Sequence, residues 1–381
     1  MNRLNGKNIG TILFTLIIIL FLMSITLVAS ASVDASELIQ KNSYGLTINH
    51  LIRVVLAFIF IVITSSIPYQ LYKKFTLHGI ILIVVLLLLQ LFFGVAKKGA
   101  IRSLELLGIE IQVSFIAVYV LVFHLANLID NKGDKVRNFK LGYLPMLFWI
   151  LILTVLIFAQ PNFSQGVLVF TAGMLIIFIG GGNLKHIIST VSAISPFFIM
   201  FLLSAEYRYQ RVDEYIQRFI SSFVEFADPQ VKYSLIAMGS GGLLGVGIGK
   251  SRFREAFIPE CYGDFIFSIL GEEFGFIGVV TVLLIYLLII GLGVIIILKT
   301  NDVFGKMIVG GTIIVLTLYV IVNTFVVIGF SPNTGLPLPF LSYGGSALIM
   351  HSIAYGVMIN VASNIKSQEN PRILFSNDSD E

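Results

Sequence analysis

FIPECYGDFIFSILGEEFGFIG, residues 257–278, runs directly into VVTVLLIYLLIIGLGVIIIL, residues 279–298. The second part carries no charge over twenty residues, which is the length that an α-helix needs to cross about 30 Å of hydrocarbon. The first part holds four carboxylates, Glu260, Asp264, Glu272 and Glu273. Ionisable side chains at the edge of a membrane span are costly unless they face a cavity or a partner. We therefore expect a transmembrane helix with a functional site at its start.

The composition is that of a protein with many membrane spans. The chain has 381 residues, of which 57% are hydrophobic and 12% charged, and its mean hydropathy is +0.95, whereas soluble proteins carry about 25% charged residues. The single cysteine, Cys261, excludes an internal disulfide and a cysteine-based metal site. The five histidines show no metal-ligand spacing. No polybasic cluster accompanies the net charge of +4, which argues against a nucleic-acid partner.

Ten apolar segments could cross the hydrocarbon layer. We expect an all-α polytopic membrane protein, a bundle of about ten transmembrane helices in one domain over residues 1–365, with a disordered cytoplasmic tail at 366–381. An even number of spans puts both termini on one side, and the short basic loops around Lys73 and Lys132 favour the cytoplasm. A large extracytoplasmic loop, about 206–266, then lies between spans seven and eight. The segments lie near 10–31, 49–70, 77–96, 111–130, 142–160, 166–182, 186–205, 267–298, 306–329 and 343–362.

The acids of the first stretch form two pairs, and each pair has two interpretations. A helix that starts near Pro259 would place Glu260 and Asp264 one turn apart on one face. One of two neighbouring acids in a partly dry setting can act as a general base, whereas the alternative is simple capping of a helix start. Glu272 and Glu273 lie about two turns deeper. They either take part in the chemistry of the site or form a buried structural pair. For the four acids together, we favour a functional site.

Basic residues and glycines precede the acids. Lys250, Arg252 and Arg254 could hold a diphosphate, because guanidinium groups bind phosphate in a bidentate manner; the alternative is a charge run that faces solvent or lipid headgroups. The tract GSGGLLGVGIGKS at 239–251 nearly matches a phosphate-binding loop, but Leu244 stands where the first glycine is required. We therefore exclude a nucleoside triphosphatase and expect a tight turn where backbones approach closely.

A second irregular stretch follows the ninth predicted span. Residues 332–346 read PNTGLPLPFLSYGGS, and their three prolines and three glycines forbid a regular helix. Irregular backbone at membrane depth is tolerated where it lines a cavity or is buried in protein. The alternative is an ordinary proline-rich loop. This stretch, the loop at 97–110 and the region 206–266 fall on the same predicted side, so together they could build one site.

Two of these stretches carry a family resemblance. Residues 257–278 and GLPLPFLSYGGSALI, residues 335–349, resemble the two C-terminal signatures of the FtsW/RodA/SpoVE family, the SEDS proteins of bacterial cell division, elongation and sporulation. The tract at 239–251 and YRYQRVDEYI at 207–216 are also similar to the family pattern. The resemblance implies a peptidoglycan glycosyltransferase of the bacterial cytoplasmic membrane. Such a protein polymerises lipid II, an undecaprenyl-pyrophosphate-linked disaccharide-pentapeptide, beside a class B penicillin-binding protein.

The resemblance also implies roles for single residues. The family's essential acid matches Asp264, in the pattern P-E-x-x-x-D-F-I-F, as a general base on the acceptor sugar hydroxyl or a stabiliser of charge on the donor. The residues that we expect to bind substrate are Glu260, Lys250, Arg252, Arg254, Arg102, Ser342 and Tyr343. Those expected to give structural support are Glu272, Glu273, Pro339, Gly344 and Gly345. No metal ligand and no organic cofactor is expected, and a divalent cation is left open.

The N-terminal half departs from the family pattern. The family usually carries Arg-Trp where this chain has Arg102-Ser103, and Gln-Pro-Ser-Glu with a nearby lysine where it has Gln112-Val113-Ser114-Phe115. Its usual His-Thr before the essential acid is Tyr262-Gly263 here. We therefore expect a divergent member, such as a sporulation-type paralogue. Two other functions stay open: a lipid II flippase or transporter, and a catalytically weak scaffold for a class B penicillin-binding protein.

Overall fold

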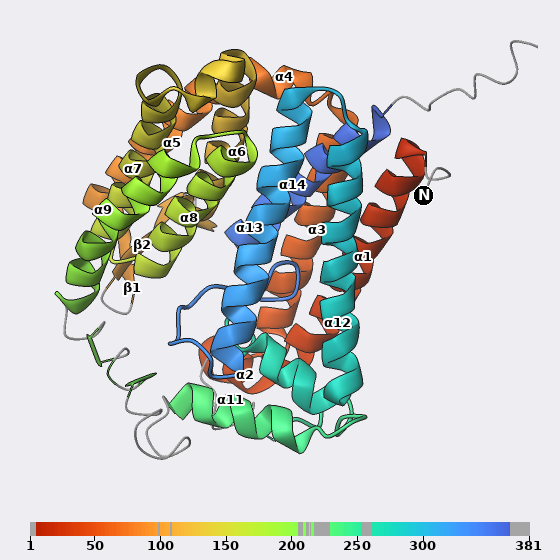
Figure 1. Cartoon of the computed structure of the whole chain (residues 1–381). Helices are drawn as coiled ribbons and strands as arrows, with labels where there is room; N and C mark the ends of the chain where they lie inside the picture. Colours follow the sequence, from red (N-terminus) through yellow and green to blue (C-terminus); the bar gives the residue numbers. More distant parts are fainter. Residues whose placement is uncertain are drawn as a thin grey trace, which may run out of the picture.

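The computed structural model is a bundle of long helices (Figure 1). It describes residues 5–97, 100–106, 109–204, 229–252 and 261–365, together with 209, 210, 213, 215 and 216. The expected tail at 366–381 lies outside these residues. The helices are α1 (Gly6–Ala31), α2 (Val33–Gln40), α3 (Gly45–Ser66), α4 (Gln70–Lys73), α5 (Thr76–Phe93), α6 (Val113–Lys132), α7 (Leu144–Ala159), α8 (Phe163–Ile179), α9 (Leu184–Leu203), α11 (Pro229–Ser240), α12 (Ile266–Lys299), α13 (Val303–Val327) and α14 (Gly345–Ser363).

Ten apolar helices of the described chain cover the ten predicted segments, and the chain is a multi-pass membrane protein. Within the described ranges, nine helices are long and apolar enough to cross a membrane, when α7 is counted together with the π-helical turn Phe139–Tyr143 before it. The tenth, α8, is a shorter apolar helix of 17 residues, and it is also the shortest segment that the sequence predicts. Each helix overlaps its predicted segment closely, because a membrane helix is defined by a run of apolar residues that ends at polar or helix-breaking ones.

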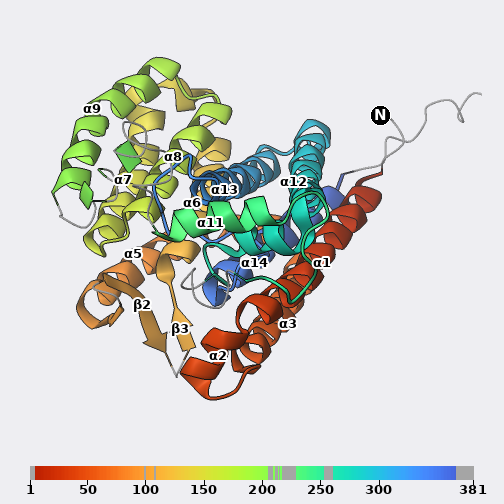
Figure 2. The same ribbon diagram turned by 90° about the horizontal axis from the view of Figure 1, so that it is seen from below.

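The first and last described residues of the chain lie at the same end of the bundle, here called the terminal end. A Cβ atom added to Gly6 would lie 2.2 Å from the carbonyl oxygen of Ala362, and one on Gly10 would lie 3.3 Å from Ser363 Oγ. The start of α1 therefore packs on the last turns of α14. The opposite end, here called the loop end, carries α2, α11 and the segment 328–344, and Figure 2 views the molecule from it.

Helix α14 forms the centre of the bundle, where α1, α3, α6 and α13 pack around it. Its contact with α3 is close, because a Cβ atom on Gly356 would lie 1.9 Å from Thr64 Oγ1. Small residues at such crossings let membrane helices approach each other, since no hydrophobic effect drives helices together inside lipid. The packing of α14 also fixes the position of the segment 328–344, which leads directly into it.

Helix α12 is broken at Gly275, and the glycine tract packs against the break. Gly275 has φ 64° and ψ −165°, so the helical hydrogen bonds stop there. The tract replaces them: Val246 N donates to Glu272 O (2.9 Å), and Phe276 N donates to Gly242 O (2.9 Å). A Cβ atom on Gly245 would lie 2.1 Å from Glu273 O. This is the close backbone approach that the tract's composition predicts. Helix α11 and the tract form the longest described part of the large loop.

The described chain is nearly all helical, with one exception. Strands β1 (Val95–Lys97), β2 (Ala100–Leu106) and β3 (Ile109–Ile111) form an antiparallel sheet where the sequence analysis expected a loop. Apolar and polar residues alternate in Leu104-Glu105-Leu106 and in Ile109-Glu110-Ile111, with two residues between them, and this is a hairpin pattern. The short helices α2, α4 and α11 were also missed. All three lie at the ends of the bundle, where runs of apolar residues do not predict helices.

Candidate functional site

Asp264 lies at the loop end, in the turn 261–265 that leads into α12. The expectation of a helix from Pro259 is wrong, since α12 begins at Ile266. The turn is held by the buried Asn323 of α13, whose Nδ2 amide donates to the carbonyl oxygens of Asp264 (2.8 Å) and Leu336 (2.9 Å). With its carbonyl bound to a side chain, the backbone of Asp264 is fixed to the segment 328–344.

The half-buried carboxylate of Asp264 faces that segment. A Cβ atom on Gly335 would lie 3.5 Å from Asp264 Oδ2, and Gly335 has φ +68°, which an L side chain rarely adopts. Glycine at this position therefore leaves open the space beside the acid. Glu260, the predicted neighbour of Asp264, lies outside the described residues.

The segment 328–344 is irregular, as its prolines and glycines predict, and it is held from several sides. The Tyr286 hydroxyl of α12 donates to the carbonyl oxygen of Pro339 (2.5 Å). Ser342 Oγ is buried and accepts from Leu338 N (2.8 Å). Phe340 is buried at φ +64°, a strained backbone for a bulky residue. These contacts give Pro339 and Ser342 a place in holding the segment; direct contact of Ser342 with substrate stays a prediction.

Tyr343 links this segment to a cation that the sequence analysis missed. Tyr343 N donates to the carbonyl oxygen of Tyr262 (2.9 Å), and the two rings meet edge to face at 5.4 Å. The Arg53 guanidinium of α3 lies over the Tyr343 ring, 4.4 Å from its centre. A Cβ atom on Gly345 would lie 3.1 Å from Arg53 Nε. One signal was available: Arg53 is the single charged residue in the predicted span 49–70.

Glu272 and Glu273 are buried and bind neighbouring backbone and hydroxyl groups. Glu272 accepts from the Ser251 hydroxyl and from Arg252 N (2.8 Å). Glu273 accepts from the Ser30 hydroxyl of α1 and from Gly249 N (3.1 Å). The two acids thus join α12, α1 and the glycine tract. These contacts are consistent with the structural role, which stays a prediction.

The remaining predicted residues are only partly placed. The side chains of Lys250 and Arg252 are exposed beside the Glu272 cluster. Arg254 lies outside the described residues, and Arg102 lies in β2 with a side chain that the structure does not describe. Gly344 and Gly345 form the start of α14. The structure therefore places Asp264 against the segment that carries Pro339, Ser342, Tyr343 and Gly344. Arg53 contacts Tyr343 of this segment and Gly345 directly after it.

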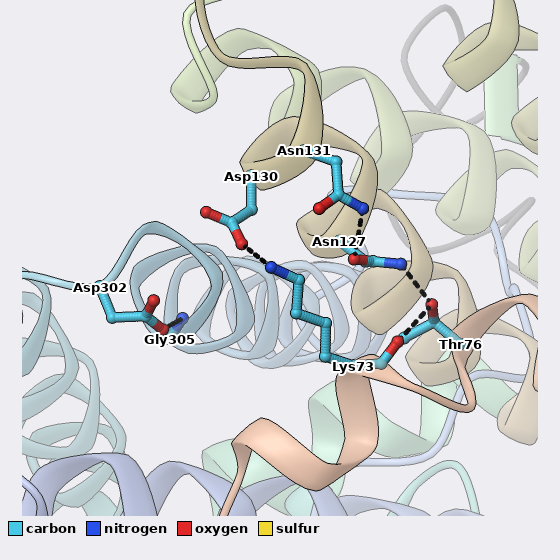
Figure 3. Close-up of polar contacts among 7 residues, drawn as sticks. All are labelled: Lys73, Thr76, Asn127, Asp130, Asn131, Asp302 and Gly305. Atoms are coloured by element: carbon cyan, nitrogen blue, oxygen red, sulfur yellow. Dashed lines mark hydrogen bonds and ion pairs between the residues drawn. The ribbon is translucent and has the colours of Figure 1, made fainter.

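A second polar cluster lies at the terminal end, far from Asp264 (Figure 3). Lys73 of α4 pairs with Asp130 of α6, and Asn127 Nδ2 donates to Thr76 Oγ1 (2.7 Å). Nearby, Asp302 caps α13 by accepting from Gly305 N (2.8 Å). Burial and, next, the Asp302 carboxylate raise the pKa of the Tyr69 phenol to about 12. These contacts tie α4 to α6 and α13, so we interpret the cluster as structural.

Over the ranges that the structure describes, no three His, Cys, Asp or Glu side chains gather in a way that could hold a metal ion.

Two solved structures share the fold over almost the whole chain. One belongs to a peptidoglycan synthase complex that coordinates polymerization and crosslinking; it matches 93% of this chain and 97% of its own, with a TM-score of 0.74 and 20% identity. The other is the rod shape determining protein RodA of Thermus thermophilus, which matches 93% and 96% of the two chains with a TM-score of 0.68 and 21% identity. At such identities the likeness concerns the fold.

Relatives with higher sequence identity point to the same family as the shared fold. A protein of Trichlorobacter lovleyi named "Probable peptidoglycan glycosyltransferase FtsW" is 30% identical over 93% of each chain. "Stage V sporulation protein E" of Bacillus subtilis is 32% identical over 71% of this chain and 73% of its own. The family model described as "Cell cycle protein", which covers FtsW, RodA and SpoVE, matches residues 10–367. The chain therefore belongs to the FtsW/RodA/SpoVE family of cell cycle proteins.

Proposed function

We propose that the protein is a peptidoglycan glycosyltransferase that polymerises lipid II into glycan strands, with Asp264 as its catalytic carboxylate. The observation that carries the proposal is the fixed position of Asp264, whose backbone is bound by Asn323 while its carboxylate faces the space at Gly335. The names of relatives that align with 93% of the chain or more support the activity. A reaction at this site needs an acid that is held in place but open to a substrate.

The chemistry assigns one proton transfer to Asp264. The carboxylate takes the proton of the acceptor sugar hydroxyl while that oxygen forms a bond to the anomeric carbon of the donor. The bond from this carbon to the diphosphate oxygen breaks, and the polyprenyl diphosphate leaves with the electron pair. A positioned general base of this kind contributes about 10²–10⁴-fold to a rate. The exposed cations Lys250 and Arg252, with Arg254, remain predicted to bind the leaving diphosphate. Glu260 remains a predicted substrate-binding residue beside Asp264.

The proposal includes an orientation and a partner. Both termini lie in the cytoplasm and the loop end faces outward, because the basic connections that include Lys73 and Lys132 lie at the terminal end and short cytoplasmic loops are enriched in lysine and arginine. A class B penicillin-binding protein crosslinks the strands that this protein makes. The solved complex with a shared fold coordinates polymerization and crosslinking, which supports such a partner.

Polymerisation of purified lipid II tests the function. The wild-type protein in nanodiscs, with and without a class B penicillin-binding protein, should give glycan strands that lengthen with time. The same reaction in Mg²⁺ and in EDTA tests whether a divalent cation is needed. Movement of labelled lipid II across vesicles without polymer would instead support the flippase. Binding of the partner without polymer or transport would support the scaffold.

A further inference from the structure

Arg53 is a cation inside a membrane span, on the loop-end half of α3. It is the ninth residue of the helix Gly45–Ser66, so its Cα lies about 12 Å from the start of the helix at 1.5 Å per residue. Side chains on a helix lean toward its N-terminus, and on α3 this direction is the loop end. A long arginine side chain can thus place its charged group near the membrane surface while its methylene groups stay among apolar neighbours.

In the part of the chain that the structure describes, no carboxylate pairs with this guanidinium. Its neighbours are the Tyr343 ring, His50 one turn earlier on α3, and Gly345 at the start of α14. The first turn of α14 contains no acidic residue either. A cation–π contact offsets only part of the cost of a charge in a span. Among the described residues, the guanidinium is therefore an electropositive group without a counter-ion.

Tyr343 connects the guanidinium to the turn that carries Asp264. Tyr343, under the guanidinium, is bonded through its amide to Tyr262, two residues before Asp264. The Tyr262 and Tyr343 rings contact each other edge to face. Gly345 has no side chain, so the guanidinium keeps the space that a Cβ atom at 3.1 Å from Nε would take. Tyr343 thus links Arg53 to the turn that carries the proposed catalytic acid.

We infer that Arg53 binds the diphosphate group of a lipid-linked diphosphate, with Tyr343 as the residue that positions it. A guanidinium presents paired N–H donors that match two phosphate oxygens. A polyprenyl diphosphate carries its charge directly at the end of an apolar chain, so it matches a cation at the outer part of an otherwise apolar span. The inference rests on the proposed function for the identity of the ligand, and it adds an anion site on α3 to the predicted basic residues of the large loop.

Direct binding tests this site without turnover. The wild-type protein, Arg53→Gln, Arg53→Lys and Tyr343→Ala are titrated in nanodiscs with undecaprenyl diphosphate and, separately, with phosphatidylglycerol. Arg53→Gln should weaken undecaprenyl diphosphate binding about tenfold or more, and Arg53→Lys less, because an ammonium keeps the charge but loses the paired donors. Tyr343→Ala should fall between wild type and Arg53→Gln. Lys74→Gln, which removes an exposed charge at the terminal end, should bind as wild type.

Unfolding temperatures separate ligand binding from a structural role. Removing an unpaired charge from a span should leave the unfolding temperature of Arg53→Gln equal or higher, whereas a structural arginine would give a clear fall. Unchanged undecaprenyl diphosphate binding in folded Arg53→Gln would overturn the inference. Equal losses for undecaprenyl diphosphate and phosphatidylglycerol would overturn it too, because the site would then bind any anionic lipid.

Kinetics distinguish this inference from the proposed function. If the wild type makes glycan strands and Arg53→Gln leaves the lipid II concentration for half-maximal rate unchanged, the inference fails alone. If the wild type makes no strands but binds undecaprenyl diphosphate through Arg53, the proposed function fails and the anion site stands.

Discussion

At the scale of single residues, Asn323 is the group that fixes Asp264, and its removal should cost activity. The Nδ2 amide serves two carbonyl oxygens, on Asp264 and Leu336. Asn323→Leu keeps the volume but leaves both oxygens without a donor, at about 1–3 kcal/mol for each buried group. We expect the polymerisation rate at saturating lipid II to fall about tenfold to hundredfold, because small displacements of a catalytic group are costly.

The control for this prediction removes a similar amide elsewhere. Asn131→Leu loses the exposed hydrogen bond to Asn127 Oδ1 at the terminal end and should polymerise lipid II as the wild type does. An Asn323→Leu protein with a wild-type rate would show that the bound carbonyls do not position Asp264.

The sequence was informative about charged residues and poor for neutral ones. Asp264 stood out because an acid beside an apolar run is rare. Arg53 carries the same signal inside the second span, although it is not among the predicted site residues. Asn323 carried none, since a buried amide in an apolar helix is as compatible with packing as with a site, and its two acceptors come from segments 59 and 13 residues away.

At the scale of elements, the glycine tract and the broken helix α12 form one unit, and Gly245 makes one of its closest contacts. Gly245 has φ +81°, and a Cβ atom there would lie 2.1 Å from Glu273 O. Gly245→Ala should therefore lower the free energy of unfolding by about 2–4 kcal/mol, through backbone strain and overpacking together. Thermal unfolding in detergent, followed by the fluorescence of Trp149, measures the change.

Gly249 provides the matched comparison. It has φ +76° but nothing within 4 Å of an added Cβ atom, so Gly249→Ala should lose only the backbone term of about 1–2 kcal/mol. Equal losses for the two variants would contradict the packing of the tract against α12.

Elements were predicted well where one physical rule defines them. A hydrocarbon layer requires long apolar helices, and this requirement placed all ten spans. The break at Gly275 was not predicted, because it depends on a partner segment about thirty residues earlier that supplies the missing hydrogen bonds. The start of α12 was placed too early for a similar reason: the turn at 261–265 is held by α13, which a local pattern does not reveal.

At the scale of the whole molecule, the orientation of the bundle can be measured directly. Lys74 at the terminal end and Leu244 at the loop end are both exposed. Each is replaced by a single cysteine in a Cys261→Ala background. A membrane-impermeant maleimide added to intact cells should label Leu244→Cys and should reach Lys74→Cys only after the membrane is opened. The reverse pattern would place the termini outside.

The most direct test of the central claim is lipid II polymerisation by Asp264→Asn. Asparagine keeps the shape of the side chain, and the backbone carbonyl that Asn323 binds is unchanged, so the protein should fold and insert normally. We predict a rate lower by about 10²–10⁴-fold, with Asp134→Asn, an exposed acid at the terminal end, unchanged. Glycan strands made by Asp264→Asn at the wild-type rate would contradict the account.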